Sequence, residues 1–221
     1  MTRPRLLDLF CGAGGAAMGY YRAGFDVVGV DIKPQPRYPF EFIQADAMTF
    51  PLEGYDAIHA SPPCQGFTAL KTMWNSRHHD DLLTPTRERL KETGLPWVIE
   101  NVEGAKPFMC EPIMLCGSMF GLGTGDAELR RHRLFELSGF TMMTPRCQHY
   151  TRHRVIGVYG GHGRDHRRTG GASVRDGTQQ FSTAQRAEAM GIDWMTGAQL
   201  SQSIPPAYTE YIGKQLMAVL V

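Results

Sequence analysis

Cys64 is the residue of this chain best placed to do covalent chemistry. It follows an apolar segment, 56–60, that predicts a buried strand, and it lies on a turn containing Pro62, Pro63 and Gly66. The prolines fix φ at two successive positions and the glycine permits a sharp turn, so we expect the thiol to stand off the end of a strand. Loops at strand ends carry much of the chemistry of α/β proteins. A cysteine on its own is more often a small buried hydrophobic residue, so its surroundings must decide.

The start of the chain has the pattern of a nucleotide-binding unit. Residues 5–10 predict a buried strand, residues 11–15 read Cys-Gly-Ala-Gly-Gly, and residues 16–23 predict a helix. Glycine lets the backbone approach a ligand closely, and a helix N-terminus offers unpaired N–H groups. The spacing is Phe-x-Gly-x-Gly-Gly rather than the full dinucleotide fingerprint, so a plain tight turn explains it equally well on its own.

Two further predicted strands, 25–30 and 42–45, are each followed by an acidic residue. Asp31 comes about 20 residues after the glycine turn, where nucleotide-binding units place a carboxylate on the ribose hydroxyls. A helix cap is the alternative for this aspartate, but two prolines shortly after it disfavour a helix. Asp46 follows the next strand. Because the pyrophosphate cradle is incomplete, the pattern favours S-adenosylmethionine over NAD.

Glu100 follows another predicted strand, 96–99, and begins the sequence Glu-Asn-Val. A predicted helix at 82–93, ended by Gly94, precedes this strand. A carboxylate at a strand end beside a reactive thiol is a candidate general acid or hydrogen-bond donor. A solvated surface glutamate is an equally good explanation of this residue taken alone.

Arginine is concentrated in one part of the chain. Between residues 130 and 175 there are ten arginines and two acidic residues, whereas the whole chain has a formal net charge of +1. Alternating basic and apolar residues at 129–135 predict a strand with Arg131 and Arg133 on one face. Residues 141–178 are interpreted as an extended basic loop or small subdomain with one strand at 155–159. Arginine rather than lysine favours phosphate or base contacts, with a solvated loop as the alternative.

The five cysteines are odd in number and irregular in spacing, which indicates a reducing compartment rather than a disulfide framework. Cys147, His149 and His153, with Cys110 and Cys116 upstream, are candidate metal ligands. The sequence contains no Cys-x-x-Cys pair. Ordinary packing and phosphate contacts are therefore favoured, and no metal site is predicted.

Length and hydropathy limit the class of protein. At 221 residues the chain is expected to form one domain, or one domain with a small appendage. No apolar run approaches the ~18 residues of a membrane span. The first residues imitate a signal peptide, with Cys11 at the place of a lipoprotein cysteine, but Asp8 interrupts the apolar stretch and glycines follow it. We therefore expect a cytoplasmic protein.

Taken in order along nearly the whole chain, these motifs resemble those of the DNA (cytosine-5)-methyltransferase family. The loop at 8–15 resembles the S-adenosylmethionine motif, residues 63–65 the nucleophile motif and residues 100–102 the cytosine-binding motif. Residues 183–191 and 199–206 resemble the last two motifs, whose helix returns to the cofactor pocket. By their own pattern, residues 182–191 predict a short capped helix ended by glycine. Residues 207–219 predict a terminal helix with one apolar stripe, formed by Tyr208, Ile212, Leu216 and Val219. The resemblance implies an α/β, Rossmann-like S-adenosylmethionine-dependent methyltransferase fold with a small basic insertion.

The resemblance also divides the chain and assigns roles to residues. Residues 1–136 would form the catalytic and cofactor-binding domain, 137–181 a reduced basic target-recognition segment, and 182–221 a segment returning to the catalytic domain. The catalytic residues would be Cys64, Glu100, Arg131 and Arg133. The residues expected to bind S-adenosyl-L-methionine are Phe10, Gly12, Gly14, Gly15, Asp31, Ile32, Asp46, Ala47, Pro63, Gln202 and Ser203. Those expected to bind the substrate are Ser61, Gln65, Gly66, Asn101, Val102, Arg152 and Arg154.

The implied reaction begins by making the cytosine ring electron-rich. Addition of the Cys64 thiolate to carbon 6 gives an enamine whose carbon 5 attacks the sulfonium methyl group, and loss of the carbon 5 proton then expels the thiol. Glu100 would stabilise protonated N3, and Arg133, with Arg131, would contact the O2 edge or a phosphate. Double-stranded DNA is the expected partner. Its target base must leave the stack at a cost of roughly a few kcal/mol, which contacts from the arginine-rich segment to phosphates would offset.

Several residues depart from the family pattern. Leu129 stands where the family usually has glutamine, and Ser201-Gln202 replaces a glycine-asparagine pair. The segment 137–181 is much shorter than the usual target recognition domain, which indicates short-site specificity or a partner chain that supplies the missing contacts. Such a minimal protein suits a bacteriophage, a mobile element or a restriction-modification system, so the resemblance implies the cytoplasm of a bacterial or phage-infected cell.

Other readings of the sequence stay open. The same chemistry could act on RNA cytosine or on a free cytidine nucleotide, because the recognition segment is so short. A non-catalytic module that binds S-adenosylmethionine or DNA is a further alternative, disfavoured by the intact Cys64, Glu100 and Arg133. A thiol redox or zinc-binding protein is disfavoured by the lack of a Cys-x-x-Cys motif.

Overall fold

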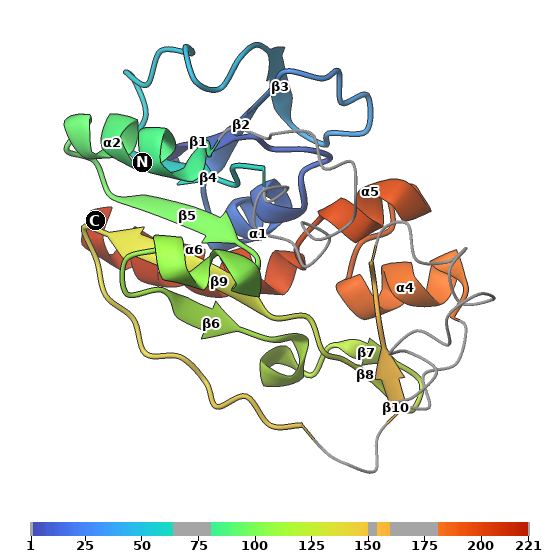
Figure 1. Ribbon diagram of the computed structural model, residues 1–221. Coiled ribbons are helices and arrows are strands. Elements are labelled where there is room, and N and C mark those ends of the chain that lie inside the picture. The colour runs from blue at the N-terminus through green and yellow to red at the C-terminus, as the bar shows by residue number, and fades with distance from the viewer. Residues whose placement is uncertain (1, 64–80, 150–153, 160–180, 221) are drawn as a thin grey trace.

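The computed structural model describes residues 2–63, 81–149, 154–159 and 181–220 (Figure 1). Five residues singled out by sequence lie outside this part of the chain: Cys64, Gln65, Gly66, Arg152 and His153. The predicted fold class is confirmed, because helices flank a central and mostly parallel sheet. No helix within the described ranges is both long and apolar enough to span a bilayer.

The central sheet has seven strands in the order β3-β2-β1-β4-β5-β9-β6. Strands β1 to β5 are mutually parallel, whereas β9 runs antiparallel to both of its neighbours. The antiparallel strand β9, which lies between β5 and β6, distinguishes this sheet from an all-parallel dinucleotide-binding sheet. The strand bounds are β1 Arg5–Leu9, β2 Asp26–Asp31, β3 Glu41–Gln44, β4 Ala57–Ala60, β5 Trp97–Asn101, β6 Ile113–Leu115 and β9 Arg133–Ser138.

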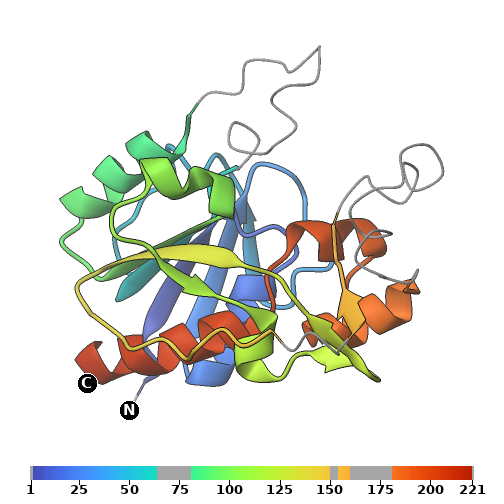
Figure 2. The same ribbon diagram turned by 60° about the horizontal axis from the view of Figure 1, so that its bottom comes forward.

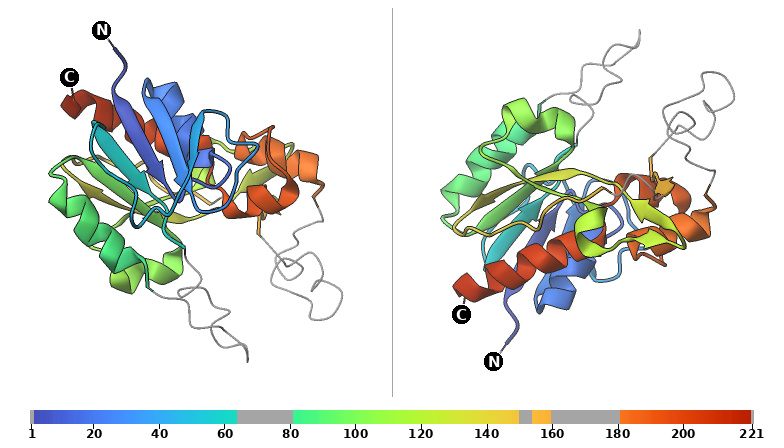
Figure 3. Two further views of the ribbon diagram at one scale, coloured as in Figure 1. Left: turned by 90° about the horizontal axis from the view of Figure 1, so that it is seen from above. Right: turned by 90° about the horizontal axis from the view of Figure 1, so that it is seen from below.

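Helices cover both faces of this sheet, as parallel strands require (Figures 2 and 3). α1 and α6 pack against one face, and α2 with the short 3-10 helix η2 packs against the other. Successive residues of β1 divide between these two layers: Leu6 joins the core beneath α1 and α6, and Leu7 joins the core beneath α2. The helix bounds are α1 Gly15–Ala23, α2 Leu83–Glu92, η2 Glu103–Phe108 and α6 Pro206–Leu220.

A second, three-stranded sheet lies at one end of the molecule in the order β10-β8-β7 (Figure 1). It packs with α4 and α5 around an apolar core of its own. The predicted capped helix in this region is confirmed, since the Ser182 side chain accepts a hydrogen bond from the Gln185 N–H and Gly191 ends α4 with φ of 65°. The bounds are η3 Gly117–Phe120, β7 Gly123–Thr124, β8 Ala127–Leu129, β10 Arg154–Ile156, α4 Thr183–Met190 and α5 Gly197–Gln202.

The single strand predicted for residues 129–135 is wrong. β8 ends at Leu129 and β9 begins at Arg133, so residues 130–132 cross from the small sheet to the central one. Arg131 and Arg133 therefore do not share one strand face. Tertiary contacts override the alternating pattern here, because the Arg131 side chain is only 1% exposed and lies among main-chain oxygen atoms.

Smaller differences occur elsewhere. β6 and α5 have no counterpart among the predicted elements, and β10 ends at Ile156 instead of reaching residue 159. Val219, predicted on the buried stripe of the terminal helix, is 52% exposed, and its neighbour Leu220 packs against the core instead. The other members of that stripe, Tyr208, Ile212 and Leu216, are fully buried as predicted.

Candidate active site

The strand order of the central sheet reverses at β1. The chain leaves β1 for β2 and β3 on one side and then returns to place β4 and β5 on the other. In open α/β sheets, ligands bind beyond the carboxyl ends of the strands at such a reversal. Leu9 at the end of β1 is aligned with Val30 of β2 and Ala60 of β4, and Ala60 is aligned with Ile99 of β5. The segments that follow these four strands therefore begin at one common edge of the sheet.

The loop after β1 lies at this edge, and its backbone at Gly12 has free space beside it. Gly12 and Gly14 have φ of 49° and 85°, which glycine adopts without strain, and Phe10 has φ of 56°, which is uncommon for a bulky residue. A Cβ built on Gly12 would meet nothing within 4 Å. The Gly12 N–H donates to Asp31 Oδ2 at 3.0 Å, which joins the loop to the end of β2. Strained backbone beside open space is a common property of ligand-binding loops.

Asp31 is half-buried and has acceptor capacity to spare. Its two oxygens accept hydrogen bonds from the N–H groups of Gly12 and Lys33, at 3.0 and 2.9 Å. Because a carboxylate offers about four acceptor positions, ribose hydroxyls could still bind. The adjacent Ile32 is 65% exposed and offers an apolar surface to a flat ring. Asp46 is exposed after β3, and its Oδ1 accepts from the Met48 N–H at 2.9 Å.

The segment after α5 covers the start of α1. A Cβ on Gly15 would lie 1.9 Å from Ser203 Oγ, so this glycine is required by packing against Ser203. The Trp194 indole N–H donates to the Ala13 carbonyl at 2.8 Å and ties the same region to the glycine loop. Gln202 is exposed at the end of α5, whereas Ala47, another predicted cofactor residue, is buried.

The turn that leads to Cys64 is anchored to the strands on both sides of β4. The Ser61 N–H donates to the Leu9 carbonyl at 3.1 Å, and the Asn101 amide donates to the Pro62 carbonyl at 3.1 Å. Pro62 is buried and Pro63 is exposed at the last described position before the cysteine. Asn101 thus fixes the backbone of this turn from β5.

Glu100 is a buried carboxyl at the end of β5 and forms an ion pair with Arg133, whose Nε lies 3.0 Å from Glu100 Oε1. Oε1 accepts no hydrogen bond of good geometry from the described residues. Burial raises the pKa of Glu100, while the charges of Arg133 and Arg131 and a hydrogen bond from Ser61 act in the opposite direction. The carboxyl therefore keeps its proton to higher pH than an ordinary glutamate and can donate it to a ligand.

A series of hydrogen bonds connects Glu100 to two buried residues, His59 and Tyr20, that were not predicted from the sequence. His59 Nδ1 lies 3.0 Å from the Tyr20 hydroxyl, and His59 Nε2 lies 2.9 Å from Ser61 Oγ, which in turn bonds to the Glu100 carboxyl. Burial lowers the pKa of His59 to about 3, so the ring is neutral and can accept at one nitrogen while it donates from the other. The only sequence signal is a histidine within the apolar segment 56–60.

Arg131 and Arg133 have different partners. The buried guanidinium of Arg131 donates to the carbonyls of Val158, Ser201 and Ser203, the last two at 2.9 and 2.6 Å. Burial lowers the pKa of Arg131 to about 9. Arg131 therefore holds the segment after α5 in place, and the predicted contact between Arg131 and the substrate stays a prediction.

Arg154 lies apart from this edge, in β10 of the small sheet. Its guanidinium forms an ion pair with Asp126 at 2.9 Å and lies over the Phe181 ring, 5.2 Å from the ring centroid. The structure thus brings together the predicted residues at or just beyond the ends of β1, β2, β4 and β5, but it does not bring Arg154 to them. Val102 follows directly after β5 at the common edge and is half-buried.

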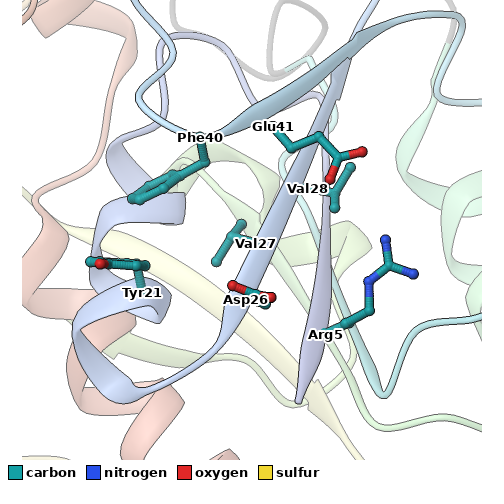
Figure 4. Close-up of a pocket in the computed structure, with 7 residues that line it drawn as sticks. All are labelled: Arg5, Tyr21, Asp26, Val27, Val28, Phe40 and Glu41. Carbon is teal, nitrogen blue, oxygen red and sulfur yellow. The ribbon is translucent and has the colours of Figure 1, made fainter. Parts of the chain in front are cut away.

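A surface hollow lies at the opposite end of the strands (Figure 4). Its lining comes from the beginnings of β1, β2 and β3 and from the last part of α1. Because the predicted site residues lie at the other edge of the sheet, this hollow has no part in the candidate site. The lining residues are Arg5, Tyr21, Asp26, Val27, Val28, Phe40 and Glu41.

Comparison with known proteins gives matches at the level of structure. No protein-family model matches the sequence, and no curated protein matches it significantly. A proposed DNA modification methyltransferase encoded within an E. coli prophage has a TM-score of 0.62 at 17% identity, covering 98% of this chain and 99% of its own. A mutant of DNMT2 from Spodoptera frugiperda has a TM-score of 0.58 at 14% sequence identity, and the match covers 97% of this chain and 99% of that protein. The methyltransferase EhMeth of Entamoeba histolytica has a TM-score of 0.57 at 14% sequence identity, and the match covers 100% of this chain and 98% of that protein. These similarities establish a shared fold.

The contacts of Arg131 predict a stability difference between two matched variants. Arg131→Lys keeps the charge but offers its donors from one nitrogen, whereas two guanidinium nitrogens of Arg131 reach the three carbonyls. At least one buried acceptor is then expected to be left unpaired, at a cost of about 1–3 kcal/mol. Arg133→Lys, at the start of β9, keeps a charge that can still pair with Glu100 and is expected to lower the free energy of unfolding by less than Arg131→Lys does. Urea denaturation followed by circular dichroism measures both. Equal losses in the two variants would show that Arg131 does not have the structural role described.

Proposed function

We propose that this protein is an S-adenosylmethionine-dependent DNA (cytosine-5)-methyltransferase with Cys64 as its nucleophile. The observation that carries the proposal is the common edge at which the glycine loop, Asp31, the turn before Cys64 and Glu100 meet. A cofactor loop and a nucleophile turn are thereby neighbours across the β1–β4 pair. The fold shared with the methyltransferase EhMeth and with the proposed prophage methyltransferase gives further support.

The residues present fit S-adenosylmethionine. Asp31 has acceptor positions for the ribose hydroxyls, the exposed Ile32 offers a surface to the adenine ring, and the open backbone at Gly12 admits the amino-acid part. Asp46 is exposed beside them for the adenine amine. When bound, this cofactor supplies the electrophilic methyl group. No full pyrophosphate fingerprint is present, which fits a nucleoside that carries no phosphate.

The chain's own residues would prepare the cytosine. The Cys64 thiolate adds to carbon 6, and the electron pair that moves through the ring makes carbon 5 nucleophilic while Glu100 gives its proton to N3. After methylation, loss of the carbon 5 proton re-forms the double bond, the thiolate leaves carbon 6 and N3 returns its proton to Glu100. Arg133, paired with Glu100, stabilises the carboxylate that the first step leaves behind.

A polynucleotide is the proposed substrate class because of charge, and DNA is proposed because the prophage neighbour is described as a DNA modification methyltransferase. The arginine-rich stretch between 130 and 175 suits a polyanion, and a polynucleotide offers many more phosphates than a nucleotide does. The target cytosine would leave the duplex to reach Cys64 and Glu100. Within the proposal, residues 137–181 act as a reduced target-recognition segment between a catalytic part, 1–136, and a returning segment, 182–221.

A trapping experiment tests the reaction and the substrate together. Duplex DNA with 5-fluorocytosine is incubated with the protein and S-adenosylmethionine that carries a tritiated methyl group. Fluorine at carbon 5 cannot leave as a proton does, so the Cys64 adduct should persist and give a labelled band that survives denaturation. Cys64→Ser should give no band, and Cys110→Ser, an exposed cysteine elsewhere, should give the band of the unaltered protein.

The other outcomes separate the alternatives. A labelled adduct only with 5-fluorocytosine RNA would keep the chemistry and replace the substrate by RNA. Undiminished labelling of Cys64→Ser would contradict the nucleophile assignment. If the protein binds S-adenosylmethionine but gives no adduct with DNA, RNA or nucleotide, it is a binding module and the proposed reaction is wrong.

The raised pKa of Glu100 predicts a specific pH dependence. Activity should fall as pH rises through the pKa of Glu100, because the proton that N3 requires is lost. The hydrogen bond from Ser61 lowers that pKa, so Ser61→Ala should raise it and move the basic limb of the kcat/KM profile to higher pH. Ser138→Ala, at the far end of β9, is the control and should leave the limb in place. A shift to lower pH in Ser61→Ala would contradict the proton donor role.

A further inference from the structure

Among the described residues, four side chains with metal-binding atoms meet at one point away from the candidate active site. They are Cys116, His132, Cys147 and His149, and their Sγ and ring nitrogen atoms all lie within 4.8 Å of one another. Cys116 precedes η3, His132 lies on the crossing between β8 and β9, and the other two lie on the chain after β9. Three separate stretches of chain therefore deliver the four groups.

The distances match the edges of a tetrahedron. Cys147 Sγ lies 3.1 Å from His149 Nε2 and 3.5 Å from His132 Nε2, and Cys116 Sγ lies 3.4 Å from His149 Nε2. With Zn–S of about 2.3 Å and Zn–N of about 2.0 Å, a tetrahedral site has sulfur–nitrogen edges of roughly 3.5 Å. Two thiolates and two imidazoles in this arrangement are the donor set of structural zinc sites.

Neighbouring residues contact three of the four ligands. His132 directs Nε2 into the cluster, and its other nitrogen, Nδ1, lies 3.1 Å from Glu103 Oε1. A carboxylate on the far nitrogen of a histidine fixes the tautomer that leaves the near nitrogen free to bind a metal. The Ser118 hydroxyl lies 3.3 Å from Cys116 Sγ and 3.6 Å from Cys147 Sγ. Each sulfur is thus held in position.

We propose that Cys116, His132, Cys147 and His149 bind one zinc ion as a closed structural site. The sequence alone favoured ordinary packing for three of these residues, since the spacing Cys-x15-His-x14-Cys-x-His contains no short cysteine pair. Packing does not explain the geometry, because apolar contacts would not bring two imidazole nitrogens against two sulfur atoms while the His149 ring stays exposed. Cys110, the other upstream cysteine, is exposed and is not one of the four.

The zinc ion would hold the first part of the arginine-rich segment, residues 130–149, in place. His132 lies between Arg131 and Arg133, so the metal holds the crossing from which one arginine reaches the segment after α5 and the other reaches Glu100. Cys147 and His149 lie at the other end of a long loop that starts at the end of β9. Closing such a loop with a metal removes much of its conformational freedom. This role does not depend on whether the protein methylates nucleic acid.

Metal content tests the proposal directly. The full-length protein, produced in medium supplemented with zinc and kept reduced, should contain about one zinc per chain by mass spectrometry, as four ligands predict. Cys147→Ser should lose nearly all of it, and the matched Cys110→Ser should keep it. An unaltered protein without zinc, or equal loss in Cys110→Ser, would overturn the proposal. A disulfide between Cys116 and Cys147 in the reduced preparation would overturn it as well.

Two further measurements hold even if a ligand variant fails to fold. Replacement of zinc by cobalt in the unaltered protein should give thiolate-to-cobalt charge-transfer bands and the intense visible bands of a tetrahedral ion. Glu103→Gln, at an exposed position, should weaken zinc at least about tenfold in competition with a chelator, whereas the exposed Glu111→Gln should not. Octahedral cobalt spectra, or equal zinc affinity in the two glutamate variants, would contradict the site.

Discussion

Strand β1 forms hydrogen bonds with β2 on one side and with β4 on the other, and both pairings are parallel. The alignment of Leu9 with Val30 and Ala60 brings the glycine loop, Asp31 and the turn before Cys64 to one edge. A slip of one residue would move every side chain of a strand to the opposite face, and Leu6 and Leu7 would then exchange the two cores. The buried faces therefore fix the register, and the register fixes the site.

Three consecutive residues connect this edge to the rest of the molecule. Arg131 binds carbonyls of the segment after α5, His132 belongs to the cysteine–histidine cluster, and Arg133 pairs with Glu100. Because residues 130–132 also cross between the two sheets, their conformation is set by contacts in several directions. This explains why a strand pattern in the sequence does not become a strand. The site carboxyl and the start of the arginine-rich segment are thereby held by the same short piece of chain.

Much of the fold could be predicted because its signals are local. Buried parallel strands are continuous apolar runs, and α4 begins with a serine cap and ends at a glycine, so periodicity and capping locate them. The carboxyl-edge residues Asp31 and Glu100 were predictable because they directly follow or end such runs. The role of His59 could not be predicted, since its partners Tyr20 and Ser61 come together only in the folded sheet. The role of His132 could not be predicted either, because Cys116, Cys147 and His149 come close to it only in the folded chain.

The binding of S-adenosylhomocysteine, measured by titration calorimetry, tests the central claim that the cofactor binds at the carboxyl ends of β1, β2 and β4. Asp31 at this edge and Asp56 at the opposite one each accept a main-chain hydrogen bond, from Gly12 and Arg5. Loss of hydrogen bonds to a charged group costs about 1.5–3 kcal/mol, so Asp31→Ala should bind about 10- to 100-fold more weakly. Asp56→Ala should bind as the unaltered protein does. Binding that is equally strong in all three proteins, or absent from the unaltered one, would contradict the account.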